Sequence, residues 1–396
     1  MKVVFISNYL NHHQIPFSNA MYRILDGNYV FIQTMPMEEE RISGGWAFED
    51  SKYPYLKKSY IQYEQCMKEI IESDIAIIGS AEDDFIEHRF KDKKIVIRYS
   101  ERIYKNGIWH VFSPKGFLNL HKKHGRAKAR NMYMLCASGY AAGDWAMQRL
   151  YGNRMYKWGY FPAFVEQELE ELMKRKQENA KCEIVWCGRF IPWKHPETVL
   201  QLAKSLKRGN FHITMIGTGE LRQEYEALLE KEDLQRKISI IGPLKPEKVR
   251  DYMERANIFL TTSDYNEGWG AVVNEAMNSG CAVVVSHALG CVPFLIEDGV
   301  NGIIYKSRKN CQLYDIINQL ISDREQRERL GRKAYGTIRD MWNADCAASN
   351  ALKLFSALLK GENIEIDAGP CSKAEPVLQW NMYRYMTRKR SKYIDE

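Results

Sequence analysis

The stretch Glu267-Gly268-Trp269-Gly270-Ala271-Val272-Val273-Asn274-Glu275 places seven residues between two glutamates. An apolar run at residues 258–260 precedes it, and Gly280 and a second apolar run at residues 281–285 follow. This order predicts a strand, a loop carrying Glu267, a helix carrying Glu275 and ending near Gly280, and a second strand. Free N–H groups at the start of such a helix can bind an anion, and a carboxylate there can accept hydrogen bonds from sugar hydroxyls.

Other motifs surround this glutamate pair. The chain has Gly188-Arg189-Phe190, Lys194 and Gly217-Thr218-Gly219 before it, and Gly290, Pro293 and Glu297-Asp298-Gly299-Val300-Asn301-Gly302 after it. From about residue 184 to residue 305 the sequence closely resembles retaining glycosyltransferases of family 4, whose E-x7-E motif has this spacing; the N-terminal half resembles them less. A lone glutamate beside a tight turn is more often a solvated side chain, but several motifs in order are more specific. The resemblance implies a GT-B fold, an α/β architecture of two Rossmann-like domains facing across a cleft.

Apolar runs alternate with helical stretches along both halves of the chain, which predicts parallel sheets covered by helices. The expected strands are residues 3–7, 30–33, 75–78, 95–99 and 133–137, then 183–187, 212–216, 238–241, 258–260, 282–285 and 303–305. We expect a Rossmann-like acceptor domain at residues 1–162 and a Rossmann-like nucleotide-sugar domain at residues 163–375. As in many GT-B proteins, the last segment, residues 376–396, is expected to return to the first domain as a helix.

The composition favours a cytoplasmic protein of two domains. The chain has 396 residues, of which 45% are hydrophobic, and its modest net charge of +7 hints at an anionic partner. No stretch approaches the roughly 20 apolar residues of a membrane-spanning helix, and the first apolar run is too short for a signal peptide. The nine cysteines include no C-x-x-C pair, which indicates reduced thiols and no zinc site. We therefore expect the protein in the cytoplasm or at the inner face of the membrane.

Two cations follow the expected strand at residues 183–187. Arg189 and Lys194 come at its carboxyl end, the edge where ligands bind in open parallel sheets. Sugar transfer from a nucleotide sugar creates a diphosphate leaving group, so fixed cations and N–H donors near it are effective catalysts. The resemblance assigns this role to both cations, places Glu267 at the donor sugar and gives Glu275 the nucleotide ribose. The alternative is a pair of solvated cations in a loop.

The remaining donor contacts implied by the resemblance are backbone contacts from small residues and one tryptophan. They are Gly188, Gly217, Gly219, Gly268, Trp269, Gly270 and Ala271. A glycine-rich turn such as the one at residues 217–219 is weak evidence alone.

The first half departs from the family pattern in two places. Many members have a glycine-rich loop after the first strand, whereas here that loop has Asn11, His12 and His13 and no glycine. These three are candidates for acceptor or donor binding, and a histidine there is equally suited to capping the next helix. Many members also have a histidine where residues 98–102 stand here. Glu101 or Ser100 is a candidate replacement; the alternative is a Glu101 paired with Arg98 or Arg102.

We expect no metal and no cofactor. The chain has no Asp-x-Asp motif, since Asp83 and Asp84 are adjacent. Cations and helix dipoles then take the place of Mg²⁺. The resemblance implies retention without a dedicated nucleophile, because the departing phosphate takes the acceptor proton.

Residues 102–130 hold eight Lys or Arg residues and no Asp or Glu, with aromatic residues between them. Basic and aromatic residues together suit an anionic membrane surface or a lipid-diphosphate acceptor. The alternative is a solvated basic helix that covers the sheet. No nucleic-acid-binding module is recognisable, so no nucleic acid partner is expected.

The sequence thus predicts a glycosyltransferase that moves a sugar from a nucleoside-diphosphate donor, a UDP-sugar above others, to a glycan or lipid-linked glycan in polysaccharide biosynthesis. One alternative is a nucleotide-sugar epimerase or hydrolase of the same fold. Another is a non-catalytic subunit that binds a nucleotide sugar or a membrane. The cations and the glutamate pair favour a transferase, and the missing histidine and glycine-rich loop keep the binding subunit open.

Overall fold

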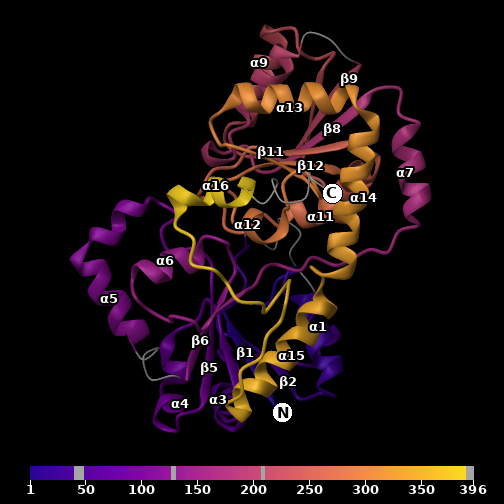
Figure 1. Cartoon of the computed structure of the whole chain (residues 1–396). Coiled ribbons are helices and arrows are strands. Elements are labelled where there is room, and N and C mark those ends of the chain that lie inside the picture. The colour runs from indigo at the N-terminus through magenta and orange to yellow at the C-terminus, as the bar shows by residue number, and fades with distance from the viewer. Residues whose placement is uncertain (40–48, 126–130, 207–209, 389–396) are drawn as a thin grey trace. The chain divides into compact units, whose positions relative to one another are not determined.

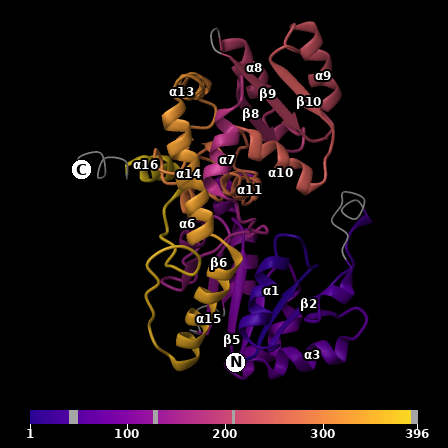
Figure 2. The ribbon, with the colours of Figure 1, turned by 90° about the vertical axis from the view of Figure 1, so that its right-hand side faces the viewer.

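The computed structural model describes residues 1–39, 49–125, 131–206 and 210–388. Its contacts divide the chain into two compact units, which can be followed by residue number in Figures 1 and 2. Unit 1 comprises Met1–Ala163 and Met341–Leu378. Unit 2 comprises Phe164–Asp340 and the described residues from Gln379 onward. Each unit has its own parallel sheet, so the two Rossmann-like domains predicted from the sequence are confirmed.

The sheet of unit 1 has the order β3-β2-β1-β4-β5-β6-β7 among the described residues. Its strands are β1 (Val3–Ser7), β2 (Tyr29–Gln33), β3 (Leu56–Lys58), β4 (Ile75–Ile78), β5 (Ile95–Ser100), β6 (Met132–Cys136) and β7 (Met155–Lys157). Val3 lies opposite Tyr29 on one side and Ile75 on the other, which sets the register of the three central strands. All of β1, β2 and β4 is buried, which explains their nearly continuous apolar sequences.

Helices cover the sheet of unit 1. They are α1 (Ile15–Ile24), α3 (Tyr63–Glu72), α4 (Glu87–Lys91), α5 (Pro114–His124), α6 (Ala141–Met147) and α15 (Ala344–Lys360), with short 3₁₀ helices η2 (Asp50–Lys52), η3 (Asp83–Ile86) and η4 (Ile108–Phe112). Helix α15 packs beside α1 (Figure 1). Its buried face includes Ala347, Ala348 and Ala351, whose small side chains allow two helices to approach closely.

The sheet of unit 2 has the order β10-β9-β8-β11-β12-β13 among the described residues. Its strands are β8 (Cys182–Cys187), β9 (Phe211–Ile216), β10 (Ile238–Ile241), β11 (Ile258–Thr261), β12 (Ala282–Ser286) and β13 (Ile303–Tyr305). Its helices are α7 (Leu169–Gln177), η6 (Pro192–Lys194), α8 (Glu197–Ser205), α9 (Arg222–Lys231), α10 (Pro246–Arg255), α11 (Val272–Asn278), α12 (Val292–Leu295), α13 (Asn310–Ser322), α14 (Arg324–Asp340) and α16 (Gln379–Arg388). The apolar core of this unit includes Trp186, Phe190 and Met215.

The strand order of unit 2 reverses direction between β8 and β11, which pair directly. In open parallel sheets, ligands bind outside the carboxyl ends of the strands at such a reversal. The loop after β8 carries Arg189 and Lys194, and the loop after β11 carries Glu267. The fold therefore brings the two predicted cations and the first glutamate to one edge of one sheet.

The last part of the chain differs from the prediction. Residues 341–378, which contain α15, group with unit 1, although most of them were expected in the second domain. Helix α16 was expected to return to the first domain, and it groups with unit 2, where Tyr383 accepts a hydrogen bond from Gln312 Nε2 at 2.8 Å. The periodicity of apolar residues predicts a helix but does not identify the sheet that it covers.

Candidate functional site

An ion pair joins the two loops at the carboxyl edge of the second sheet. Lys194 Nζ lies 2.5 Å from Glu267 Oε2, and the two side chains are only 14% and 16% exposed. The sequence predicted catalytic roles for both residues without predicting that they touch. Because water screens this pair poorly, Lys194 is held in place before any ligand binds.

Arg189 presents its charge differently from Lys194. It is exposed, and its guanidinium lies over the Trp193 ring, with 5.7 Å from Cζ to the ring centroid. Among the described residues, no carboxylate pairs with Arg189. A cation stacked on an aromatic ring keeps its hydrogen-bond donors free for an anion. Gly188 precedes it, beside the Lys194 side chain, with 3.5 Å between a Cβ placed on Gly188 and Lys194 Cδ.

The carboxyl group of Glu275 stands on α11 in a partly buried position. Loss of water around it raises its pKa to about 7, opposed by the charge of Arg250. No side-chain hydrogen bond or ion pair of Glu275 is found among the described residues. Cys187 stands at the end of β8, and the pKa of its thiol is raised first by loss of water around it and then by the charge of Glu275. A carboxyl in this state can accept hydrogen bonds from a ligand hydroxyl.

The loop between the two glutamates is attached to the core through Trp269. This side chain is 1% exposed, and its Nε1 donates to Asn274 Oδ1 at 2.8 Å. Gly270 has a φ of 87°, and a Cβ there would lie 3.0 Å from Leu289 Cδ2. The side chain of Trp269 is thus part of the core, and Gly268 and Ala271 beside it are partly exposed. The burial of this side chain leaves the backbone of residue 269 for the predicted donor contact, which stays a prediction.

The glycines at 217 and 219 allow close contact with the cation loop. A Cβ on Gly217 would lie 2.0 Å from Gly188 O, and one on Gly219 would lie 2.5 Å from Phe190 O. Their φ angles, 148° and 152°, also disfavour other residues. Phe190 N donates to Thr218 O at 2.8 Å. These glycines therefore position the backbone on both sides of Arg189, a role that the sequence prediction of donor contacts did not include.

His195 is a site residue that sequence reasoning missed. It has a φ of 48°, and its imidazole lies 2.7 Å from Glu197 Oε1 through Nδ1 and 3.2 Å from Asp264 Oδ2 through Nε2. Hydrogen bonds to Asp264 and then to Glu197 raise the His195 pKa to about 9. The imidazolium thus ties the cation loop to the loop that carries Glu267. The sequence feature that could have indicated a role for His195 is its position next to Lys194.

Two backbone contacts reinforce this connection. Asp264 N donates to Trp193 O at 3.0 Å, and Thr262 Oγ1 donates to Lys194 O. The cation loop and the glutamate loop are therefore held together by an imidazolium, an ion pair and two hydrogen bonds.

The candidate residues of unit 1 lie around Tyr160. The rings of His13 and Tyr160 stack with 5.5 Å between centroids, and Tyr99 and Tyr160 stack at 6.4 Å. Burial lowers the pKa of His12 to about 4 and that of His13 to about 3, so both are neutral at pH 7. Asn11 is used locally, because its Oδ1 accepts from His13 N and Gln14 N at 3.0 and 3.2 Å. The asparagine thus supports the turn that starts α1.

Glu101 has partners other than those that its sequence neighbours suggested. Its Oε1 accepts from Tyr160 OH at 2.5 Å, and its Oε2 pairs with Lys105. The alternative pairing with Arg98 or Arg102 is wrong. Arg98 Nη1 binds Asp83 Oδ1 at 2.6 Å, and the buried Arg102 Nη2 binds Asp144 Oδ1 at 3.1 Å. Both carboxylates are distant in sequence from the arginines that they bind. Glu101 is therefore placed among Tyr99, Tyr160 and His13.

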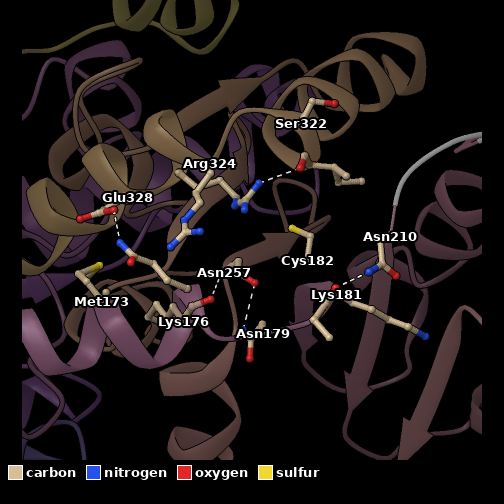
Figure 3. A pocket seen from close by; sticks show the side chains of 15 residues that line it. Met173, Lys176, Asn179, Lys181, Cys182, Asn210, Asn257, Ser322, Arg324 and Glu328 are labelled. Atoms are coloured by element: carbon tan, nitrogen blue, oxygen red, sulfur yellow. Dashed lines mark hydrogen bonds between the residues drawn. The ribbon is translucent and has the colours of Figure 1, made fainter.

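A cavity of about 320 Å³ in unit 2 lies at the opposite edge of the sheet from the candidate site (Figure 3). Its lining includes Cys182 and Asn257, which stand at the amino ends of β8 and β11, and Arg324 and Glu328 of α14. It contains none of the candidate residues. Because ligands of open parallel sheets bind at the carboxyl ends, this cavity is not the predicted donor site.

The described residues hold no cluster of three or more His, Cys, Asp or Glu side chains arranged to bind a metal ion. Within the same residues, no helix has the length and apolar character needed to cross a membrane.

Sequence comparison supports the reading of unit 2. Residues 169–337 match the family model described as Glycosyl transferases group 1. Spore coat protein SA of Bacillus subtilis (strain 168) is 26% identical over 195 residues, which are 47% of this chain and 52% of that protein. Alpha-D-kanosaminyltransferase of Streptomyces kanamyceticus is 27% identical over 174 residues, or 43% of this chain and 45% of that protein. The chain thus spans about half the length of the curated relatives that it matches.

Structural comparison extends over both units. HepE of Anabaena, solved in complex with UDP, superposes with a TM-score of 0.68 at 14% identity, covering 90% of this chain and 100% of that chain. A structure of HepE with UDP-glucose gives a TM-score of 0.62. At this identity the likeness concerns the fold, and it confirms the predicted GT-B class. The family match and the name of the second relative both support a transferase.

Proposed function

We propose that this protein is a retaining glycosyltransferase of family 4 that moves a sugar from a UDP-sugar to a glycan or lipid-linked glycan. The observation that carries the proposal is the grouping of Arg189, the Lys194–Glu267 ion pair and Glu275 at the switch point of unit 2. HepE, which has the same fold, was solved with UDP and with UDP-glucose. The reaction then belongs to polysaccharide biosynthesis in the cytoplasm or at the inner face of its membrane.

In the proposed reaction, the two cations stabilise the leaving group. Breaking the bond between the anomeric carbon and the phosphate oxygen increases negative charge on the diphosphate. Arg189, with no described carboxylate partner, neutralises part of that charge, and Lys194 is already oriented by Glu267. Charges that are fixed before the reaction need no reorganisation in the transition state. No metal ion or cofactor enters this scheme.

Glu275 is proposed to hold the ribose of the donor. Its carboxyl has no hydrogen-bond or ion-pair partner among the described residues, and burial raises its pKa. Ribose hydroxyl groups would supply those donors and favour the ionised carboxylate. Glu267 is proposed to face the sugar, with its second oxygen on Lys194. The backbone of Gly268–Ala271 lies between the two.

Retention follows when attack and departure occur on the same face of the sugar. The acceptor oxygen bonds to the anomeric carbon, the bond to the phosphate oxygen breaks, and the acceptor proton passes to that oxygen. This step requires no protein nucleophile. In unit 1, the group formed by Glu101, Tyr160, Tyr99 and His13 is proposed to bind the acceptor, because stacked rings and a carboxylate suit a sugar face and its hydroxyls.

The test is binding and turnover with a panel of UDP-, GDP- and ADP-sugars. A donor present at roughly 100 times its Kd should stabilise the native state by about 2.7 kcal/mol, and slow donor hydrolysis should follow. Arg189→Ala should abolish both, whereas Arg236→Ala, a control on the surface of unit 2, should not. Binding without hydrolysis or transfer would identify a non-catalytic subunit, and an altered but uncleaved donor would identify an epimerase.

A further inference from the structure

The segment between β5 and β6 exposes large apolar side chains close together. The exposed fractions are 80% for Trp109, 76% for Phe112 and 66% for Leu118, and Phe117 is 44% exposed. We call these four side chains the apolar tip. Trp109 and Phe112 lie on η4 with 6.4 Å between their ring centroids, and the other two lie on α5. Several large apolar side chains left exposed on one short segment often mark a surface that binds something.

The apolar tip stands on a segment that is fixed to unit 1. Ser113 Oγ accepts from Gly116 N at 3.1 Å and caps the start of α5. On the inner face of α5, His121 Nε2 lies 3.0 Å from Gln148 O, and His124 Nδ1 lies 2.6 Å from Tyr151 OH. The inner face is thus used for packing on unit 1, and Figure 1 shows α5 at the outside of that unit. The exposure of the tip is a property of the folded segment.

Lysines border the apolar tip. Lys115, Leu118 and Lys122 are spaced three and four residues apart along α5, so they lie on one face, and both lysines are exposed. Lys123 is also exposed, with Asp83 Oδ1 3.6 Å from its Nζ. Residues 102–125 contain no Asp or Glu. The outer surface of this segment is therefore both apolar and positively charged.

Ion pairs use several charges of the basic stretch predicted from the sequence. Arg102 is buried against Asp144, Lys105 pairs with Glu101, and Lys123 pairs with Asp83. Arg126, Lys128 and Arg130 lie outside the described residues. Among the described residues of the stretch, Lys115 and Lys122 are therefore the exposed cations without a carboxylate partner, and both lie on α5 with the apolar tip.

We propose that the apolar tip, Lys115 and Lys122 form a docking surface for an anionic lipid bilayer. Trp109 and Phe112 enter the interfacial region, where an indole finds both apolar and polar surroundings. The lysines meet the lipid phosphates, which supplies the charge complementarity. This inference rests on the proposed function in one respect: a lipid-linked acceptor is presented at the same surface. A second protein copy is the competing occupant, and the basic border argues against it, because two copies would bring like charges together.

The experiment measures co-sedimentation of the full chain with phosphatidylcholine vesicles with and without phosphatidylglycerol. The wild type should bind the anionic vesicles, and added salt should weaken that binding. Trp109→Ser combined with Phe112→Ser should reduce binding roughly tenfold or more, and Lys115→Glu combined with Lys122→Glu should do the same for anionic vesicles only. The controls are Trp380→Ser, which removes a tryptophan that is 63% exposed on α16, and Lys231→Glu combined with Lys360→Glu, two exposed lysines elsewhere.

The outcomes separate this inference from the proposed function. Anionic-vesicle binding that the tip variants lose and the controls keep supports the docking surface, whether or not the protein hydrolyses a donor. If the wild type hydrolyses its donor but does not bind vesicles, the proposed docking surface is wrong and the proposed function stands. The proposal is also overturned if the wild type does not bind vesicles and sediments as a dimer that the tip variants convert to a monomer. That result would assign the tip to contact with a second copy of the chain.

Discussion

Lys194 Nζ lies 2.5 Å from Glu267 Oε2, so a catalytic candidate on the loop after β8 is paired with one on the loop after β11. Each charge compensates the other while the site holds no ligand. In the proposed reaction, donor binding adds a diphosphate and gives Lys194 a second anionic partner. The pair with Glu267 would then keep this cation ordered and partly buried before the donor binds.

Lys194→Ala should lower turnover by about 10²–10³-fold, because the leaving group loses a pre-positioned charge. We expect the free energy of unfolding to fall by only about 1–2 kcal/mol, since the Glu267 side chain keeps partial access to water when its partner is lost. Steady-state kinetics and chemical denaturation measure the two effects. Lys204→Ala, which removes an exposed lysine from α8 of the same unit, should change neither. Normal turnover in a strongly destabilised variant would assign Lys194 a structural role.

Glu275→Gln should stabilise the fold and weaken donor binding. Burial raises the Glu275 pKa from 4.5 to about 7, so ionisation costs the folded state stability as the pH rises from about 4.5 to 7. Glutamine avoids that cost, and we expect a gain of about 1–3 kcal/mol at pH 8 and almost none at pH 4. Wild-type affinity for the nucleotide should improve as the pH rises from 6 to 8, because the ionised carboxylate accepts the ribose hydrogen bonds.

Thermal denaturation across pH and isothermal titration with UDP measure these two effects for Glu275→Gln. Glu224→Gln, on the exposed part of α9, is the matched control. Unchanged nucleotide affinity in Glu275→Gln at pH 8 would remove Glu275 from the donor site.

His195→Gln should reduce turnover and remove an alkaline limit on activity. The wild-type imidazolium faces Glu197 on α8 and Asp264 after β11, and Tyr225 OH donates to Glu197 from α9. Because the His195 pKa is raised to about 9, its contribution to stability is complete below pH 6.5 and is lost as the pH rises through 9. A pH–rate profile should therefore fall near pH 9 in the wild type, and that step should be absent in the variant.

His195→Gly provides the control for backbone strain. It relieves the positive φ of 48° but also removes the imidazolium. If strain alone mattered, this variant would keep wild-type turnover and His195→Gln would lose it. We expect both variants to lose turnover.

Gly217→Ala should destabilise unit 2 by about 2 kcal/mol or more, because the new Cβ meets Gly188 O at 2.0 Å in a backbone conformation that disfavours alanine. Relief of that clash would displace the loop that carries Arg189, so donor affinity should fall as well. Gly336→Ala on α14, where the nearest atom to a new Cβ is Asp340 Oδ2 at 3.8 Å, should leave both unchanged. Equal stability of the two variants in denaturant would show that the loops separate without cost.

The strands and the switch point were predictable because parallel strands are continuous apolar runs, which the sequence displays directly. The strands that were missed, β3 and β7, have three residues each, and β3 reads Leu-Lys-Lys. Their pairing depends on the neighbouring strand rather than on their own composition.

The site was predictable where one motif carried it. Spacing and strand ends predicted Glu267, Glu275, Arg189 and Lys194 as candidates, and the fold brings both cations and Glu267 to one sheet edge. His195 was missed because its meaning comes from Asp264, 69 residues away along the chain. The partners of Glu101 were misjudged for the same reason, since Tyr160 is 59 residues distant. A sequence motif identifies candidate residues within one loop. It does not identify side chains whose partners lie on a second loop distant in the sequence.

The division of the chain has a consequence for its synthesis. Unit 1 contains β1, yet it also contains α15 and the residues that follow it as far as Leu378. A ribosome that works from the N-terminus therefore releases the sheet strands of unit 2, complete by Tyr305, before it releases the helix that packs on α1. Unit 1 is therefore synthesised first in part and completed last. Until α15 has been synthesised, the apolar face of α1 lacks the helix that covers it. A nascent chain halted at Asp340 should hold an assembled second sheet and an incomplete first unit.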